Sequence, residues 1–270
     1  MRSKENFKYI YGPVSSWRLG NSLGIDLLSQ EAKICSFDCI YCQLGRIINY
    51  TTERKLYIPI EEIVEELERL PNVQIDYITF SGRGEPTLAE NLGQVIKAVK
   101  TLRTEPVAVL TNSSLIDRED VREELNLADF IVVKLDAYSP ESLREINRPA
   151  KGVEFGNILT GIKQFRKIYT GKMALQIMFT EENKNKAAQL AYLANYIKPD
   201  EIQINTPLRS CDIRPLSKEE IFKIKEYFVD KCEFAFDGKK RNIISVYDVK
   251  TQRETCPISN TDTLKRRGKI

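Results

Sequence analysis

Apolar positions along the chain change their spacing repeatedly, and this predicts helices that alternate with strands. In residues 60–70, apolar side chains recur three or four positions apart with glutamates between them, which indicates an amphipathic helix. Short continuous apolar runs, such as residues 130–135, indicate strands that are buried on both faces. Residues 217–220 read Ser-Lys-Glu-Glu, a capping box that predicts the start of a helix ending near residue 229.

Six expected strands alternate with helices, which predicts an α/β fold with parallel strands and right-handed crossovers. We expect an irregular N-terminal arm over residues 1–21, a core over 22–229 and a C-terminal extension over 230–270. Residues 232–236 and 242–249 alternate like two strands and predict an added hairpin. No linker or repeat interrupts the chain, so a single domain is expected overall. The six strands are expected at residues 22–28, 77–80, 107–110, 130–135, 173–179 and 201–205.

The composition is that of an ordinary soluble globular protein, with 42% hydrophobic and 29% charged residues among 270. No apolar run follows the N-terminus, and no segment reaches the roughly 18 apolar residues that a membrane span needs. We therefore expect a cytoplasmic protein with no membrane partner and with reduced cysteines. The net charge of +3 neither requires nor excludes a nucleic-acid partner, and the absence of histidine leaves proton transfer to other groups.

Three cysteines, Cys35, Cys39 and Cys42, fall within one short segment after the first expected strand. A loop with this spacing can direct three thiolates toward one centre, and thiolates suit iron–sulfur clusters or zinc. A [4Fe–4S] cluster held by three thiolates has one iron free to bind another molecule. Two other interpretations stay open: a zinc site, which wants four ligands and finds no histidine here, and a disulfide pair with one thiol left over.

The spacing Cys-x3-Cys-x2-Cys, with the aromatic Tyr41 before the last cysteine, resembles the signature of the radical S-adenosylmethionine (SAM) superfamily. The segments Leu23-Gly24-Ile25-Asp26 and Cys42-Gln43-Leu44-Gly45 resemble its wyosine-synthetase-like branch. The resemblance covers roughly residues 12–216 and implies an open (β/α)6 partial TIM barrel, here with a small C-terminal β appendix. Six units are too few for the closed eight-stranded barrel.

In that family a [4Fe–4S] cluster binds SAM and cleaves it to a 5′-deoxyadenosyl radical, which abstracts a hydrogen from the substrate. The resemblance therefore implies a radical SAM enzyme with a [4Fe–4S] cluster and SAM as cofactors, served by a low-potential electron donor of the flavodoxin or ferredoxin type. The wyosine-like segments imply a tRNA base as substrate. A peptide, a protein or a small metabolite is the alternative substrate, and a non-catalytic metal-binding module is the alternative function.

Further candidates follow the expected strands at their carboxyl ends, where parallel α/β folds gather functional groups. Gly84 and Glu85 resemble the family's glycine–glutamate motif, which binds the SAM amino group, although Arg83 stands where a glycine is common. A surface turn is the structural alternative. By resemblance, Asn112 and Ser113 are candidates for the SAM carboxylate or ribose, and a helix N-cap is the alternative.

Side-chain alternation along the strands supplies more candidates. Lys134 and Asp136 share the face opposite the apolar set, so we expect them at the barrel mouth in contact with substrate or SAM. A mutual ion pair is the alternative. By the same argument Gln176, Gln203 and Asn205 face inward, and their amides suit neutral ribose and adenine.

Three cysteines lie outside the motif. Cys211 follows the last expected strand by six residues, near the expected mouth, and is a candidate catalytic residue. An auxiliary cluster on Cys211, Cys232 and Cys256 would need ligands separated by 21 and 24 residues, which is no compact spacing, and buried free cysteines are the alternative.

Arg148 is either a bidentate ligand for a carboxylate or phosphate or a surface loop residue.

Overall fold

The computed structural model describes residues 7–46, 50–248, 257–258 and 263. These residues form one eight-stranded sheet in which neighbours in space are also neighbours in sequence, from β1 to β8. β1 runs antiparallel to β2, and each later strand is parallel to the one before it. The strands are β1 (Ile10–Ser16), β2 (Gly20–Ile25), β3 (Tyr77–Phe80), β4 (Val107–Thr111), β5 (Phe130–Lys134), β6 (Lys172–Met178), β7 (Glu201–Asn205) and β8 (Asn242–Ser245).

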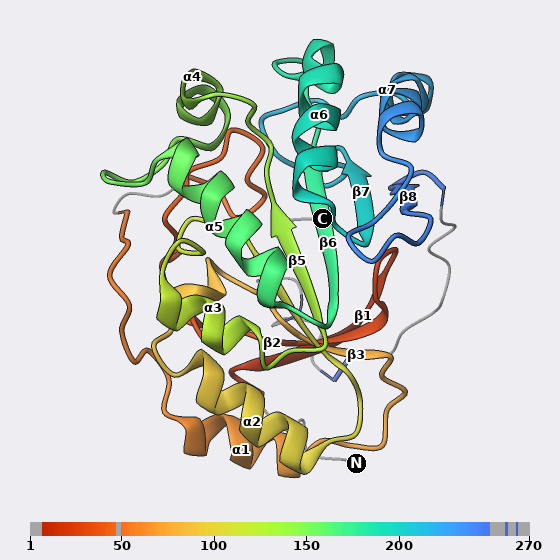
Figure 1. Ribbon diagram of the computed structural model, residues 1–270. Helices are drawn as coiled ribbons and strands as arrows, with labels where there is room; N and C mark the ends of the chain where they lie inside the picture. The colour runs from red at the N-terminus through yellow and green to blue at the C-terminus, as the bar shows by residue number, and fades with distance from the viewer. Residues whose placement is uncertain (1–6, 47–49, 249–256, 259–262, 264–270) are drawn as a thin grey trace.

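The helices follow the strands along the outer side of the curved sheet (Figure 1). They are α1 (Ile60–Glu68), α2 (Leu92–Leu102), α3 (Glu119–Leu125), α4 (Pro140–Ser142), α5 (Phe155–Ile168), α6 (Ala187–Ile197) and α7 (Lys218–Lys231). Short 3-10 turns at Pro86–Leu88 and Lys184–Lys186 and a π turn at Leu143–Asn147 complete the helical elements. Among the helices described, none has the length and apolar character needed to cross a bilayer.

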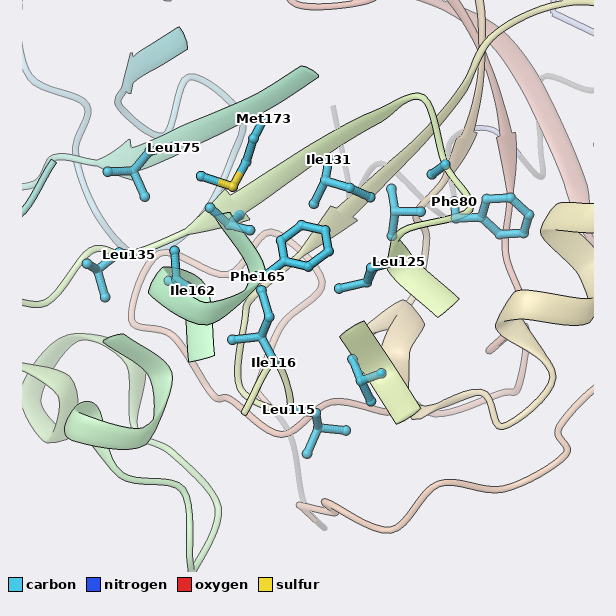
Figure 2. Packing of buried hydrophobic residues seen from close by; sticks show 14 of the residues in the cluster. Phe80, Leu115, Ile116, Leu125, Ile131, Leu135, Ile162, Phe165, Met173 and Leu175 are labelled. Atoms are coloured by element: carbon cyan, nitrogen blue, oxygen red, sulfur yellow. The ribbon is translucent and has the colours of Figure 1, made fainter. Parts of the chain in front are cut away.

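Alternate residues of the strands face two different environments, as the sequence pattern predicted. Ile131 and Met173 face outward and are fully buried against α5, whose Phe165 ring lies beside them in Figure 2. The inward side chains form a second, much smaller apolar cluster inside the barrel. Its buried members are Leu19, Ala108, Phe130, Val132 and Ala174. The sheet therefore separates a large helix-covered core from a partly polar interior.

The α/β partial barrel is confirmed, and the six expected strands correspond to β2 to β7. The structure corrects two predictions at the edges. The arm expected to be irregular contains β1, whose alternation is hidden by a register shift between Tyr11 and Val14. The expected C-terminal hairpin is reduced to one antiparallel bridge between Phe234 and Lys240, and Asn242–Ser245 pairs in parallel with β7 as an eighth strand. The domain boundaries inferred from the sequence stay a prediction.

The start of β1 is held by a buried carboxylate on α1. Glu66 accepts hydrogen bonds from the backbone N–H groups of Lys8 (2.5 Å), Tyr9 (3.1 Å) and Ile10 (2.9 Å). Glu66→Ala is expected to lower the free energy of unfolding by about 2–3 kcal/mol, because it leaves these donors without their acceptor. Urea denaturation measures the change, and the exposed Glu68→Ala on the same helix is the control. Equal losses in the two variants would contradict this role.

Candidate functional site

The cysteine loop, residues 34–45, follows β2 at the carboxyl end of the sheet and is clamped on one side by the turn after β3. The Ile34 N–H donates to the Arg83 carbonyl (3.1 Å), and the Glu85 N–H donates to the Ile34 carbonyl (3.1 Å). A Cβ at Gly84 would lie 1.6 Å from the Ile34 carbonyl oxygen. Glycine is therefore required for the two backbones to approach this closely.

A second backbone segment, residues 146–150, clamps the other side of the cysteine loop. The Asp38 N–H donates to the Arg148 carbonyl (3.1 Å), and the Ile40 N–H donates to the Ile146 carbonyl (2.9 Å). The Arg148 side chain is exposed, so the structure uses this residue through its main chain. The loop that carries the cysteines is thus fixed from β3 on one side and from the segment after β5 on the other.

Cys35, Cys39 and Cys42 are free, partly buried thiols. Burial raises the pKa of Cys35 to about 12, and the charges of Cys39 and Glu85 add to the effect. Burial also raises the pKa of Cys39, although the charge of Lys134 opposes it. These two thiols therefore carry their protons near neutral pH, and a metal centre that binds them as thiolates would release those protons.

Two asparagine amides point at the sulfurs of the loop. The Asn112 Nδ2 lies 3.5 Å from the Cys35 Sγ and 3.0 Å from the Ser36 Oγ. The Asn147 Nδ2 lies 3.4 Å from the Cys39 Sγ. An N–H directed at a sulfur favours the thiolate over the thiol. Asn112 was expected at the site from the sequence, whereas Asn147 was not.

A buried lysine places a positive charge beside the cysteine loop. The Lys33 Nζ lies 3.6 Å from the Asp38 Oδ1 and 3.3 Å from the Gly45 carbonyl oxygen. Burial lowers the pKa of Lys33, but the charges of Cys42 and Cys35 act against it, and the pKa is raised overall. Lys33 therefore stays protonated and partly offsets the negative charge of the thiolates. The sequence analysis missed it, since one lysine before a motif carries no spacing signal.

A polar network joins the cysteine loop to the ends of β5 and β6. The buried Asp136 accepts hydrogen bonds from the Tyr41 hydroxyl, from the Asn147 Nδ2 (2.9 Å) and from the Met178 N–H (2.7 Å). The Lys134 Nζ lies 2.8 Å from the Tyr41 Oη and 3.4 Å from the Asp136 Oδ2. Burial, followed by the charge of Asp136, raises the pKa of Tyr41 well above its usual value. The ion pair considered as an alternative is present, and the Lys134 side chain, 22% exposed, is its accessible member.

Glu85 and Ser113 are buried, and they support Asn112 and Lys134 respectively. Glu85 accepts from the Thr111 hydroxyl (2.7 Å) and from the Asn112 N–H (2.6 Å). Burial raises the pKa of Glu85, and these hydrogen bonds oppose the rise. Ser113 has a left-handed φ of 68°, and its hydroxyl accepts from the Lys134 N–H (3.1 Å). Both residues therefore position their neighbours, and only Asn112 of the three is partly exposed.

The predicted amides of β6 and β7 lie inside the barrel. Gln176 pairs in register with Lys134 and with Gln203, which places all three on the inner face. The Gln176 Nε2 lies 3.3 Å from the Gln203 Oε1, and both side chains are buried. Asn205 is only partly buried at the carboxyl end of β7, where its side chain accepts from the Thr206 N–H (2.9 Å). Asn205 is thus nearer to solvent than the two glutamines.

Of the remaining cysteines, the structure describes Cys211 and Cys232, which have different surroundings. Cys211 packs against a small apolar cluster at the barrel mouth that Cys39 also touches. Cys232 is buried at the end of α7, where its Sγ donates to the Ala191 carbonyl of α6 (3.2 Å). Cys256 lies outside the described residues. The apolar cluster consists of Tyr41, Ile146 and Met178.

The donor set fits an iron–sulfur cluster better than a single metal ion. Among the side chains described, no three of His, Cys, Asp or Glu lie close enough to hold one ion. A zinc ion with Zn–S bonds of about 2.3 Å would draw its sulfurs together to roughly 4 Å. In a cluster each thiolate binds a different iron, so the sulfurs surround a wider centre. Three thiols on one clamped loop, with an amide donor from each of two neighbouring segments, suit such a centre.

The comparison with protein families decides the assignment. The model described as the radical SAM superfamily matches residues 32–194. The chain belongs to the radical SAM superfamily. It is therefore a radical SAM enzyme, a class that uses SAM, an iron–sulfur cluster and a reductant, and the non-catalytic metal-binding module is not supported.

Two relatives and one solved structure illustrate the similarity of this radical SAM enzyme to known proteins. A UPF0026 protein of Synechocystis sp. is 44% identical over 217 residues, which cover 79% of each chain. A probable GTP 3′,8-cyclase of Saccharolobus islandicus is 25% identical over 66% of this chain and 56% of its own. SuiB of Streptococcus suis bound to SAM has a TM-score of 0.60 at 17% identity, over 79% of this chain and 48% of SuiB. The SuiB likeness confirms the fold, and the wyosine-like branch stays a prediction.

Asn147 is expected to raise the reduction potential of the bound cluster, because its N–H stabilises the additional negative charge of the reduced state. One such hydrogen bond is worth about 1 kcal/mol, which corresponds to about 40 mV for a one-electron step. The midpoint potential of the Asn147→Ala cluster should therefore lie about 40 mV below that of the wild type. A redox titration followed by electron paramagnetic resonance measures the shift. The exposed Asn195→Ala on α6 is the control. An unchanged potential in Asn147→Ala would refute the effect.

Proposed function

We propose that Cys35, Cys39 and Cys42 hold a [4Fe–4S] cluster whose remaining iron binds SAM. When bound, the cluster supplies the electron that breaks a sulfonium C–S bond of SAM and so starts hydrogen abstraction from the substrate. The observation that carries the proposal is the position of the three thiols. They share one loop, clamped on both sides, at the carboxyl end of the parallel strands.

The residues around the loop divide into those that reach SAM and those that position others. Asn112 is the best candidate for a SAM contact, because it is partly exposed and its amide lies beside Cys35. Gly84 permits the close approach of the loop, Glu85 holds Asn112 in place, and Ser113 holds the main chain at Lys134. The further SAM candidates, for ribose and adenine, are Tyr41, Gln176, Gln203 and Asn205.

Of Lys134, Asp136 and Cys211, the candidates for contact with the reacting substrate, we keep Lys134 and Cys211 in that role. Lys134 is supported best, because its ammonium group lies at the barrel mouth and is partly exposed. Asp136 holds the Tyr41 hydroxyl and the Met178 N–H, so we assign it to positioning Lys134 and Tyr41. Cys211 is supported by its place at the mouth beside the apolar cluster.

Anaerobic loading with iron and sulfide tests the proposed chemistry. We expect about four irons per chain, and release of 5′-deoxyadenosine and methionine from SAM after reduction. A chain that stays colourless, or whose loop thiols bind zinc, would overturn the proposal. We place the enzyme in the cytoplasm with a flavodoxin- or ferredoxin-type donor, which the need for a low-potential electron supports.

Two substrate classes follow from the resemblance and from the relatives. A tRNA base is supported by the wyosine-like segments, of which Gln43 lies in the cysteine loop and contacts Arg209. A peptide or small metabolite is supported by the names of similar proteins, since SuiB is bound to the precursor peptide SuiA and the cyclase is named for GTP. Filter binding of bulk tRNA across a salt series separates the two classes. Binding that does not weaken with salt, or no binding, would exclude tRNA.

A further inference from the structure

Arg18 is a partly buried basic side chain beside the barrel interior, and no salt bridge to it is formed among the residues that the structure describes. It lies in the turn between β1 and β2, next to Leu19, which packs against Phe130 and Val132 inside the barrel. Its guanidinium carbon lies 5.5 Å from the centre of the Trp17 ring, a cation–π contact that leaves the charge without an anionic partner. Its Nε is buried without a hydrogen-bond acceptor, which is unfavourable, so this arrangement needs an explanation.

Glu201, the acid whose charge acts on Arg18, already has other partners. The Glu201 Oε2 lies 2.8 Å from the Lys172 Nζ and 2.8 Å from the Asn242 Nδ2. Its Oε1 accepts from the Gln203 Nε2 (2.7 Å). Both carboxylate oxygens therefore accept hydrogen bonds from other donors. Glu201 attracts Arg18 electrostatically but makes no hydrogen bond with it.

A second guanidinium approaches from the side of the cysteine loop. Arg209 follows β7, and its Nη1 lies 3.3 Å from the Gln43 Oε1 in the cysteine loop. Burial lowers the pKa of Arg18 to about 10, and the charge of Arg209 lowers it further, whereas Glu201 and Tyr11 act in the opposite direction. The two positive charges therefore repel each other, Arg18 from the β1–β2 turn and Arg209 from beside the cysteine loop, and an anion bound by Arg18 would relieve this repulsion.

We propose that Arg18, with Arg209 on the side of the cysteine loop, binds an anionic group of the substrate, a phosphate or a carboxylate, inside the barrel. A guanidinium binds either group through two parallel hydrogen bonds. Gln176 and Gln203 line the same interior and suit an uncharged polar part of that molecule. This inference rests on the proposed function, because it assigns the substrate of that site to the anionic metabolites or anionic residues of a larger molecule.

Calorimetric binding of two small anions to the cluster-loaded full-length chain tests the site. The probes are pyrophosphate and malonate, and the one that binds shows whether phosphate or carboxylate is preferred. Arg18→Gln is expected to weaken binding by about tenfold or more, as for the loss of a charge-assisted pair. The control Arg144→Gln removes an exposed guanidinium that pairs with Glu141 and should leave binding within about twofold. No binding of either anion to the wild type, or equal binding by Arg18→Gln, would overturn the site.

The variant Arg18→Lys and a comparison with SAM binding test the same site in two further ways. If Arg18→Gln does not fold, Arg18→Lys keeps the charge but loses the two-pronged geometry, and an unchanged affinity in that variant would overturn the site. Equal weakening of SAM and anion binding would assign Arg18 to the cofactor and overturn a substrate role. Anion binding through Arg18 without SAM cleavage would overturn the proposed function alone, and SAM cleavage without anion binding would overturn this site alone.

Discussion

Cys39→Ala is expected to lose the iron–sulfur cluster and, with it, the cleavage of SAM. Iron after anaerobic loading should fall from about four per chain to background, because two thiolates cannot hold a four-iron cluster against solvent. Release of 5′-deoxyadenosine should fall by about 100-fold or more. Mutating a residue that only hydrogen-bonds a metal ligand already lowers metal affinity or activity by roughly 10- to 100-fold, and Cys39 is itself a proposed ligand. Iron analysis and product quantification on the same sample measure both effects.

The matched control for Cys39→Ala removes a different thiol from the same chain. Cys232 is fully buried at the end of α7, and its thiol donates to the Ala191 carbonyl. Cys232→Ser keeps that donor, so it should load iron and cleave SAM like the wild type. Loss of iron in Cys232→Ser to the same extent as in Cys39→Ala would mean that the loop is not the cluster site.

Gly84→Ala is expected to damage both the fold and the site. The added Cβ would lie 1.6 Å from the Ile34 carbonyl oxygen and 2.7 Å from its carbonyl carbon, and both are backbone atoms that cannot rotate away. Relief of the clash separates Ile34 from Arg83 and Glu85 and breaks the hydrogen bonds on that side of the cysteine loop. We expect a loss of about 3 kcal/mol or more in the free energy of unfolding. Iron loading should fall as well.

Gly156→Ala provides the matched control for this substitution. Gly156 lies in α5, and a Cβ there meets nothing within 4 Å. Alanine in a helix interior is preferred over glycine by up to about 1 kcal/mol, so this variant should be as stable as the wild type or slightly more stable. Urea denaturation and iron analysis compare the two variants. A Gly84→Ala protein as stable and as well loaded as Gly156→Ala would show that the loop tolerates displacement there.

Local patterns in the sequence were sufficient to predict the sheet and part of the site. The alternation of β5 placed Ile131 toward the helices and Lys134 toward the mouth, as the structure confirms. The cysteine spacing led to the family, which the family comparison confirms. These features depend on residues close together in the chain, where spacing alone determines which side chains share a face or a loop.

The features that the sequence did not reveal depend on contacts between distant segments. Asn147 reaches Cys39 only because residues 146–150 pair with the cysteine loop, 108 positions away in the case of these two side chains. β1 was missed because a register shift hides its alternation and because its start is held by Glu66 on α1, 56 positions away from Ile10. Arg18 lies in a turn, where a lone basic residue usually reaches solvent, and only the folded sheet shows that its Nε is buried.

The clamp on the cysteine loop is built from main-chain groups, and this has an evolutionary consequence. Arg148 contributes a carbonyl oxygen while its side chain is exposed, so this side chain can change among relatives if the new residue tolerates the left-handed φ of 46°. Arg83 is less free, because its Nη2 also donates to the Glu31 carbonyl (2.6 Å) ahead of the loop. Divergence at Arg148 would therefore say little about whether a descendant keeps its cluster, whereas a larger residue at Gly84 would mark a lineage that had rebuilt the loop or abandoned it.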